Sequence, residues 1–311
     1  MPSPQTISRI AIIGFGEAGG IFGADLASQG IAVSVFDILL ASEPHRQRML
    51  AKARDSGVKA ENTLRDCVRD ADLVISAVTA SSALDVARDA GPLLDAQQTF
   101  LDINSVSPDT KRKASACIES NSGKSGARFV EAAVMAAVPG KGLGVPMLLG
   151  GPHAQAASES LRTVGMNAIA LSDQIGVASA VKMCRSVIMK GLEALAIECL
   201  FAARQYGAED AVLESLAATY PGMGWEDRLP DYLISRVAEH GQRRAAELRE
   251  VAQTLQEVAV EPTMALGAAL RQEQLAREIV ECNFRVEPAK PFSWRLLADA
   301  LLSRRRNQSS E

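Results

Sequence analysis

The amino-acid sequence predicts an α/β domain built on a doubly wound parallel sheet, followed by an all-α C-terminal domain. Two observations carry this prediction. Apolar strand patterns alternate with helical segments up to about residue 172, and beyond that point almost no strand pattern remains among good helix formers. Because 311 residues are enough for two domains of ordinary size, we place them at 1–172 and 173–311.

The first element is the apolar run 10–14, which predicts a buried parallel strand ending at a glycine. Glycines at 14, 16 and 19 then have the spacing of a dinucleotide-binding turn. The first permits the tight turn, the second lets backbone approach a pyrophosphate, and the third lets the next helix pack on the strand. The helix that starts there offers N–H groups to the phosphate, which indicates a Rossmann-like domain. The cofactor-binding residues expected in this turn are Gly14, Phe15, Gly16, Glu17, Ala18 and Gly19.

A second apolar strand, 32–36, ends at Asp37, eighteen residues beyond Gly19. A carboxylate at this position accepts hydrogen bonds from the adenosine ribose in dinucleotide-binding domains. Its charge would repel a 2′-phosphate, so the expected cofactor is NAD. Arg46 and Arg48 lie nearby in the sequence, and they leave NADP open.

Further strands and helices follow in alternation. Strands are expected at Val58, 71–78, 99–103, 128–134, 147–150 and 167–171, with helices at 43–56, 108–121 and 154–164. In the second domain, helices are expected at 175–204, 208–219, 227–258, 262–282 and 294–303, with breaks at 221–224 and 286–291.

Composition narrows the class of protein. The net charge of −4 and the lack of a basic block in the folded part argue against nucleic acid as the main partner. No run approaches the eighteen uncharged apolar residues of a membrane span, and the N-terminus lacks the pattern of a signal peptide. Five scattered cysteines without C-x-x-C spacing suit a reducing cytosol and predict no metal site. We expect a cytoplasmic protein.

Ligands of doubly wound sheets bind beyond the carboxyl ends of the strands, so the loops there are the candidate site. Asn104 and Ser105 follow the strand 99–103 and are expected to hydrogen-bond nicotinamide or substrate, whereas Ser107 before Pro108 has the pattern of a helix cap. After the strand 71–78, the segment Thr-Ala-Ser-Ser at 79–82 could either lie along the cofactor or cap the next helix. The cofactor residues expected at that strand end are Ala77, Val78 and Thr79.

Polar residues recur at steps of three and four along the apolar stretch 175–204, so they form one stripe on a helix. They are Ser179, Lys182, Ser186, Lys190 and Glu193, with Arg185 beside them. One interpretation is that a lysine snorkels out of a half-buried helix. The other is that the stripe faces an anionic ligand and that an apolar wall lowers the pKa of Lys182 for general-base catalysis.

Together these pieces resemble the β-hydroxyacid dehydrogenase superfamily, which includes 3-hydroxyisobutyrate dehydrogenase and 6-phosphogluconate dehydrogenase. The resemblance covers most of the chain and rests on three motifs: the turn 14–19, Asp-Ile-Asn-Ser-Val-Ser-Pro at 102–108 and Gly-Val-Ala-Ser-Ala-Val-Lys at 176–182. In that superfamily the first motif holds the cofactor, the second belongs to the substrate site, and the lysine is the general acid/base. The resemblance therefore implies that Lys182 is the catalytic lysine.

Two departures indicate a divergent branch with its own C-terminal domain. The substrate motif Asp-Ala-Pro-Val-Ser-Gly-Gly falls on 131–137, which is Glu-Ala-Ala-Val-Met-Ala-Ala here, so the serine and both glycines that grip a carboxylate are missing. The asparagine usual four residues after the lysine is Ser186. The substrate is therefore not expected to be 3-hydroxyisobutyrate or 6-phosphogluconate. The residues expected to contact substrate are Ser105, Met135, Ala136, Arg185, Ser186 and Lys190.

The expected function is an NAD(P)-dependent dehydrogenase that transfers a hydride between nicotinamide and a small hydroxylated carboxylic acid or related anion. Lys182 would take the hydroxyl proton, while Asn104 and Ser105 orient the reacting groups. An imine-reducing or decarboxylating relative, and a non-catalytic redox sensor or scaffold, remain alternatives. The long apolar helix also predicts a homodimer whose C-terminal domains pack together.

Overall fold

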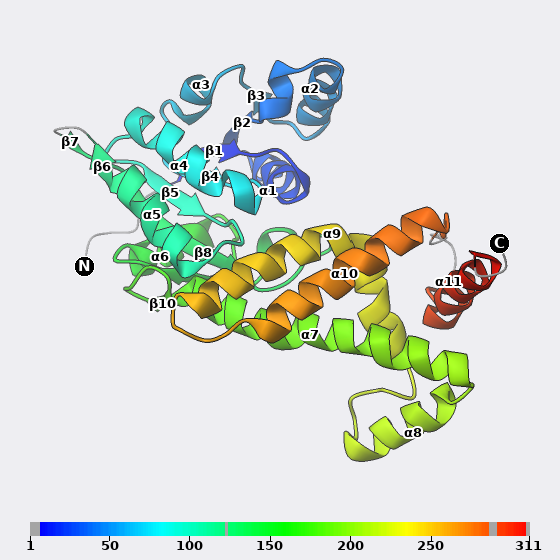
Figure 1. Ribbon diagram of the computed structural model, residues 1–311. Coiled ribbons are helices and arrows are strands. Elements are labelled where there is room, and N and C mark those ends of the chain that lie inside the picture. Colours follow the sequence, from blue (N-terminus) through cyan, green and yellow to red (C-terminus); the bar gives the residue numbers. More distant parts are fainter. Residues whose placement is uncertain (1–6, 122–123, 286–290, 309–311) are drawn as a thin grey trace. The chain divides into compact units, whose positions relative to one another are not determined.

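The computed structural model describes residues 7–121, 124–285 and 291–308. The chain divides into two compact units, residues 1–183 and 184–311, and helix α7 (Val177–Tyr206) contributes to both (Figure 1). The domain boundary that the sequence places after residue 172 therefore stays a prediction. Of the two expected breaks between C-terminal helices, 221–224 is a turn, whereas 286–290 lies outside the described residues.

Eight strands form one mixed sheet in the first unit, in the order β10-β9-β8-β5-β4-β1-β2-β3, and most neighbours are parallel. This confirms the predicted doubly wound α/β class. The strands are β1 (Arg9–Ile13), β2 (Ala32–Phe36), β3 (Lys59–Ala60), β4 (Leu73–Ser76), β5 (Thr99–Asp102), β8 (Arg128–Val134), β9 (Met147–Gly150) and β10 (Ala168–Ser172). A separate antiparallel hairpin, β6 (Ser120–Asn121) with β7 (Lys124–Ser125), follows α5 and was not expected from the sequence.

The sheet is not parallel throughout, because β8 and β9 pair in the antiparallel sense. A parallel crossover needs a dozen or more residues and usually a helix. The connection 135–146 holds only a short 3-10 turn at Gly142–Gly144, so the chain turns back beside β8. β10 is parallel to β9 and therefore runs opposite to the other strands. The sequence predicted a parallel sheet, and the sheet departs from this prediction only at the pairing of β8 with β9 among the described strands.

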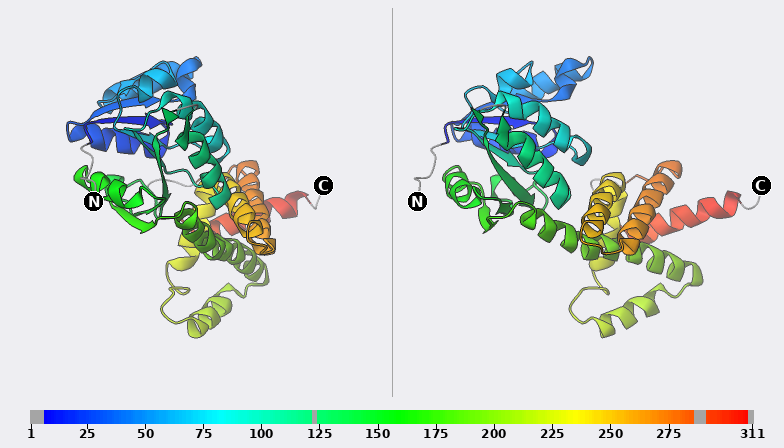
Figure 2. Two further views of the ribbon diagram at one scale, coloured as in Figure 1. Left: turned by 90° about the vertical axis from the view of Figure 1, so that its left-hand side faces the viewer. Right: turned by 60° about the vertical axis from the view of Figure 1, so that its left-hand side comes forward.

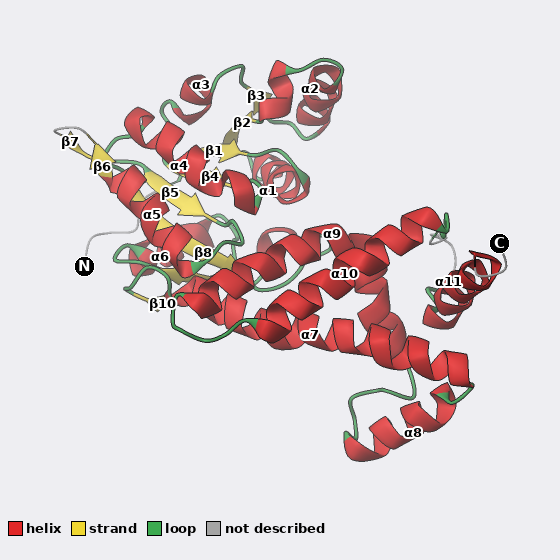
Figure 3. Cartoon of the chain, in the orientation of Figure 1, coloured by secondary structure: helices red, strands yellow, loops and turns green. Residues whose placement is uncertain are grey.

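Helices cover both faces of the sheet, since two separate apolar cores lie against it; the helices are red and the strands yellow in Figure 3. Ile10 and Ile12 of β1 belong to one apolar core, and Ala11 and Ile13 belong to the other. The first core lies under α1 (Glu17–Ser28), α2 (His45–Asp55) and α6 (Ala154–Thr163). The second lies under α3 (Leu64–Val68), α4 (Ala83–Ala90) and α5 (Pro108–Glu119). Near-continuous burial of the central strands follows from this double cover.

The described residues of the second unit form helices and connecting loops without a strand, as predicted. Its helices after α7 are α8 (Glu209–Thr219), α9 (Leu229–Gln256), α10 (Thr263–Glu281) and α11 (Trp294–Gln308). α9 and α10 pack side by side (Figure 2), and a Cβ at Gly241 of α9 would lie 2.9 Å from the Cβ of Ala276. In the part of the chain that the structure describes, no helix is long and apolar enough to cross a membrane.

Candidate active site

The glycine turn after β1 has the close contacts and the open space that are typical of a dinucleotide-binding turn. Gly14 has a φ of +92°, and a Cβ there would collide with the carbonyl oxygen of Ala77 beyond β4. A Cβ at Gly19 would collide with the carbonyl oxygen of Gly14, so helix α1 packs directly on the turn. A Cβ at Gly16, in contrast, would meet nothing within 4 Å. The turn therefore leaves open space at the start of α1, where an anion is favoured.

Asp37 closes this turn from the end of β2. One of its carboxylate oxygens accepts the N–H of Phe15 at 2.7 Å, and the other accepts the N–H of Leu39 at 3.0 Å. The carboxylate thus links β2 to the turn and still has lone pairs for ribose hydroxyls. Arg46 donates to the carbonyl of Leu40 and to Asn62, whereas Arg48 is exposed.

Asn104 connects the loops after β4 and β5. Its Oδ1 accepts the N–H of Val78 at 2.7 Å, and its Nδ2 donates to Asp102 Oδ1 at 2.6 Å and to Ser76 Oγ at 2.9 Å. The amide of Asn104 is therefore engaged within the protein and fixes the conformation of Ser105, the next residue. Nearby, neither Thr79 nor Ser82 caps a helix through its side chain, so the capping alternative has no support in this loop. Ser107, as expected, caps α5.

A buried ion pair lies under this loop. Lys111 of α5 donates to the carbonyl oxygen of Asp102 at 2.8 Å and lies 3.0 Å from its Oδ1, and both side chains are 1% exposed. Sequence reasoning missed this lysine. The signal was present, because the buried residues Lys111, Ala114, Ser115 and Ile118 follow helical spacing on one face of α5.

Glu131 of β8 holds the start of α7. Its Oε1 accepts the N–H of Gly176 at 2.7 Å and that of Ala178 at 3.1 Å, and its side chain is fully buried. A carboxylate at a helix N-terminus satisfies N–H groups that have no intrahelical acceptor and favours the helix dipole. The sequence placed Glu131 in an altered substrate motif but gave it no role.

Lys182 is the last residue of the motif 176–182 and lies on α7, and its Nζ donates to Ser105 Oγ at 2.5 Å. The structure thus brings together the predicted catalytic lysine and the predicted loop serine, 77 residues apart in the chain. Lys182 is half-buried, in contrast to the buried Ser179 one turn earlier. Ser105 follows β5 and the glycine turn follows β1, so both lie at the carboxyl edge of the parallel strands.

The later part of the polar stripe is a buried network inside the second unit. Lys190 lies 3.0 Å from Glu247 of α9, and Glu193 forms a bidentate pair with Arg244. Burial lowers the pKa of Lys190 and raises the pKa of Glu193. Gln272 of α10 also donates to Glu193 at 3.0 Å. The charge of Lys190, which was expected to face an anionic ligand, is here matched by Glu247 of a neighbouring helix.

Other expected substrate residues differ in exposure. Ser186 is buried and accepts a hydrogen bond from Lys190 at 3.4 Å, whereas Arg185 is exposed. Met135 donates its N–H to the carbonyl of Pro146 at 2.9 Å, and Ala136, two residues after the end of β8, is exposed. The methyl group of Ala136 supplies no hydrogen bond to a carboxylate.

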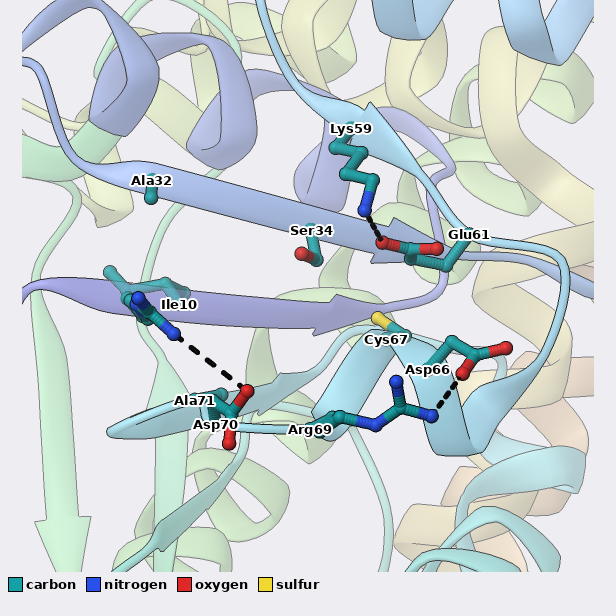
Figure 4. A pocket seen from close by; sticks show the side chains of 11 residues that line it. Ile10, Ala32, Ser34, Lys59, Glu61, Asp66, Cys67, Arg69, Asp70 and Ala71 are labelled. Atoms are coloured by element: carbon teal, nitrogen blue, oxygen red, sulfur yellow. Dashed lines mark hydrogen bonds and ion pairs between the residues drawn. The ribbon is translucent and has the colours of Figure 1, made fainter.

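A hollow of about 370 Å³ on the first unit is a different place (Figure 4). Its charged residues pair with one another, Lys59 with Glu61 at 2.7 Å and Arg69 with Asp66. None of the predicted site residues lines this hollow. Among the described residues, no group of three or more His, Cys, Asp or Glu side chains has the arrangement of a metal site.

The turn with open space for a pyrophosphate, beside the strands where the sheet order reverses, defines a dinucleotide-binding protein of the Rossmann class. Residues 9–171 match the family described as the NAD binding domain of 6-phosphogluconate dehydrogenase, and the chain belongs to this family. Residues 203–275 match a second family, the domain of unknown function DUF1932. The predicted superfamily, its NAD-type cofactor and a branch with a separate C-terminal domain are thereby confirmed.

Relatives agree with this assignment. A conserved hypothetical protein from Sinorhizobium meliloti 1021 is 33% identical, with 97% of this chain and 98% of that chain covered and a TM-score of 0.77. A protein of unknown function with structural similarity to 3-hydroxyacid dehydrogenases is 34% identical, with 86% and 98% covered and a TM-score of 0.68. The 3-hydroxyisobutyrate dehydrogenase of Pseudomonas aeruginosa is 26% identical over 70% of this chain and 72% of its own length.

Proposed function

We propose that this protein is an NAD(P)-dependent oxidoreductase that interconverts a hydroxyl carbon and a carbonyl carbon in a small anionic substrate. The observation that carries the proposal is the 2.5 Å contact between Lys182 Nζ and Ser105 Oγ, at the edge of the sheet where the dinucleotide turn lies. Kinship with 3-hydroxyisobutyrate dehydrogenase supports the same class of reaction. NAD is the preferred cofactor in this proposal, because the Asp37 carboxylate would repel a 2′-phosphate.

Each residue of the candidate site has its own role in the proposed hydride transfer. When bound, the nicotinamide ring supplies the hydride acceptor or donor. The neutral Lys182 amine accepts the hydroxyl proton of the substrate during oxidation and returns it during reduction. Ser105 orients the substrate oxygen toward this amine, and Asn104 keeps the Ser105 loop in place through its three hydrogen bonds. Gly14, Gly16 and Gly19 provide the turn for the pyrophosphate.

An anionic substrate needs a cation, and Arg185 is the cation we propose. It is exposed and lies three residues after Lys182 on the same helix, so it is one helical turn away. Lys190 is a weaker candidate because Glu247 already neutralises it at 3.0 Å.

Replacement of Lys182 by methionine tests the proposal. A nicotinamide-fluorescence titration with NADH and NADPH measures cofactor affinity, and a panel of small hydroxy acids and their keto forms measures turnover. We expect Lys182→Met to lose at least a hundredfold in kcat, as loss of a general base does, while cofactor affinity stays within twofold. Lys113→Met, which removes an exposed lysine of α5, is the control and should retain both. A wild-type protein that binds cofactor without turning over any hydroxy or keto acid of the panel would instead support the sensor or scaffold.

We also propose a homodimer that forms through α7. Exposed apolar residues recur along this helix at steps of four, seven, seven and eleven, which is the spacing of a helix-pairing seam. They are Val177, Val181, Ile188, Leu195 and Tyr206. Light scattering should give twice the chain mass of 33.0 kDa, and Ile188→Glu should give a monomer. A monomeric wild-type protein at micromolar concentration would contradict this arrangement.

A further inference from the structure

One lysine of helix α2, Lys52, contacts the dinucleotide turn. Lys52 Nζ donates to the carbonyl oxygen of Phe15 at 2.7 Å and to that of Gly16 at 2.6 Å. The same ammonium lies 4.5 Å from the centroid of the Phe15 ring, a cation–π distance. Lys52 is half-buried, and nothing in the dinucleotide fingerprint asks for a lysine at this position.

The directions of the two carbonyls determine those of two amide groups, and the carbonyl of Gly16 also accepts the helical N–H of Gly20 at 3.1 Å. In a trans peptide unit the C=O and N–H bonds point to opposite sides. When the carbonyls of Phe15 and Gly16 point to Lys52, the N–H groups of Gly16 and Glu17 point away from it. These residues are the N-cap and first residue of α1, so their N–H groups have no intrahelical acceptor. They are the groups that a helix start presents to an anion.

Gly20 explains how Lys52 reaches the turn. The fingerprint accounts for the glycines at 14, 16 and 19, but it leaves Gly20 without a role. A Cβ at Gly20 would lie 2.5 Å from Lys52 Nζ and 2.7 Å from its Cε. Glycine inside a helix is less favourable than alanine because it loses more conformational freedom on folding. Helix α1 therefore has a residue of low helix propensity, Gly20, at the position where the Lys52 side chain lies against it.

We propose that Lys52 is a positioning residue for the cofactor: it lies behind the turn, orients the amides of Gly16 and Glu17 toward the pyrophosphate, and depends on Gly20 for access. Charge-assisted hydrogen bonds of this kind are stronger than neutral ones, so they hold the two peptide units in one orientation before the cofactor arrives. Pre-ordering of a binding loop raises affinity because less order is lost on binding.

Three variants test this inference through cofactor affinity, whether or not a substrate is known. The measurement is the dissociation constant for NADH or NADPH, whichever the wild-type protein binds more tightly, by nicotinamide fluorescence. Lys52→Met should weaken binding about tenfold, the loss of one or two such bonds. Gly20→Ala should weaken it to a similar extent because the new methyl group displaces the flexible end of Lys52. Arg54→Met removes an exposed charge from the same helix and should stay within twofold.

The double variant of Lys52→Met and Gly20→Ala distinguishes an effect on the orientation of the turn from a general loss of stability. Gly20→Ala raises helix propensity and should leave the thermal midpoint unchanged or higher, so its loss of affinity cannot come from unfolding. In the Lys52→Met background, Gly20→Ala should weaken binding no further. Affinity of Lys52→Met within twofold of wild type would overturn the inference. Additive losses in the double variant would overturn it as well, because Gly20 would then act on the cofactor independently of Lys52.

Discussion

Replacement of Lys111 by methionine tests the buried support of the candidate site. Lys111 is almost completely enclosed, and its ammonium lies 3.0 Å from Asp102 Oδ1. Methionine has a similar length but no charge, so the substitution leaves the Asp102 carboxylate buried without its cation. Asp102 also accepts the N–H of Asn104 at 2.9 Å, so the loop that carries Ser105 depends on the same oxygen.

Removal of one partner from a buried pair is destabilising by about 3–5 kcal/mol, because an uncompensated charge remains in the core. A domain of this size loses roughly 2–4 °C in Tm per kcal/mol, so we expect Lys111→Met to lower Tm by roughly 6–20 °C. Urea denaturation followed by circular dichroism gives the free energy of unfolding independently. Lys113 offers a matched control on the same helix, since it pairs with Asp109 at 2.6 Å while 60% exposed. Lys113→Met should change stability by less than about 1 kcal/mol.

The double variant Asp102→Asn with Lys111→Met identifies the cause. Asparagine keeps an acceptor for Asn104 and removes the charge, so this variant should recover about half or more of the stability that Lys111→Met loses. The interpretation fails if Lys111→Met stays within about 1 kcal/mol of wild type. It also fails if the double variant is as unstable as the sum of the two single variants, because Lys111 would then act through packing alone.

Two further predictions concern ionisable groups elsewhere. Burial raises the pKa of Cys67 to about 12, so iodoacetamide at about pH 8 should leave Cys67 unmodified in the native protein and modify it after denaturation, as peptide mass spectrometry can show. Hydrogen bonds from Arg204 lower the pKa of Asp299. The folded-state value is therefore below the unfolded value, and the stabilisation is present above the unfolded pKa and lost as pH falls through the folded one. The difference in urea midpoint between wild type and Asp299→Asn should accordingly shrink between about pH 5 and pH 2, and a constant difference would contradict it.

Much of the fold could be predicted because its signals are local. The strands 32–36, 128–134 and 147–150 have the bounds that the structure shows, since each is a short apolar run between turn residues. The antiparallel pairing of β8 with β9 could not be read from strand patterns, because direction depends on the connection. The short helix α3 (Leu64–Val68) was missed because five residues are too few for a periodic pattern.

The parts of the candidate site that belong to sequence motifs could be predicted. The buried charged residues that support it could not. The spacing of Gly14, Gly16 and Gly19 and the position of Lys182 are readable along the chain. Lys52 and Glu131 act on backbone groups more than thirty residues away, and no periodicity links a side chain to a distant carbonyl or N–H. Lysines are rarely buried in proteins. From sequence alone, a lysine on a helix such as Lys111 is therefore expected on a solvated helix face.

Two neighbouring carboxylates of the sheet hold the two halves of the proposed catalytic pair. Asp102 of β5 and Glu131 of β8 are register partners, so their side chains leave the sheet on the same face. Asp102 holds the loop of Ser105, and Glu131 holds the first turn of the helix that carries Lys182. The distance between Ser105 and Lys182 is therefore set by adjacent positions of a rigid sheet. This support includes Glu131, the first residue of the altered substrate motif, but does not involve Met135 or Ala136, so these later positions could diverge while the geometry for proton transfer stayed the same.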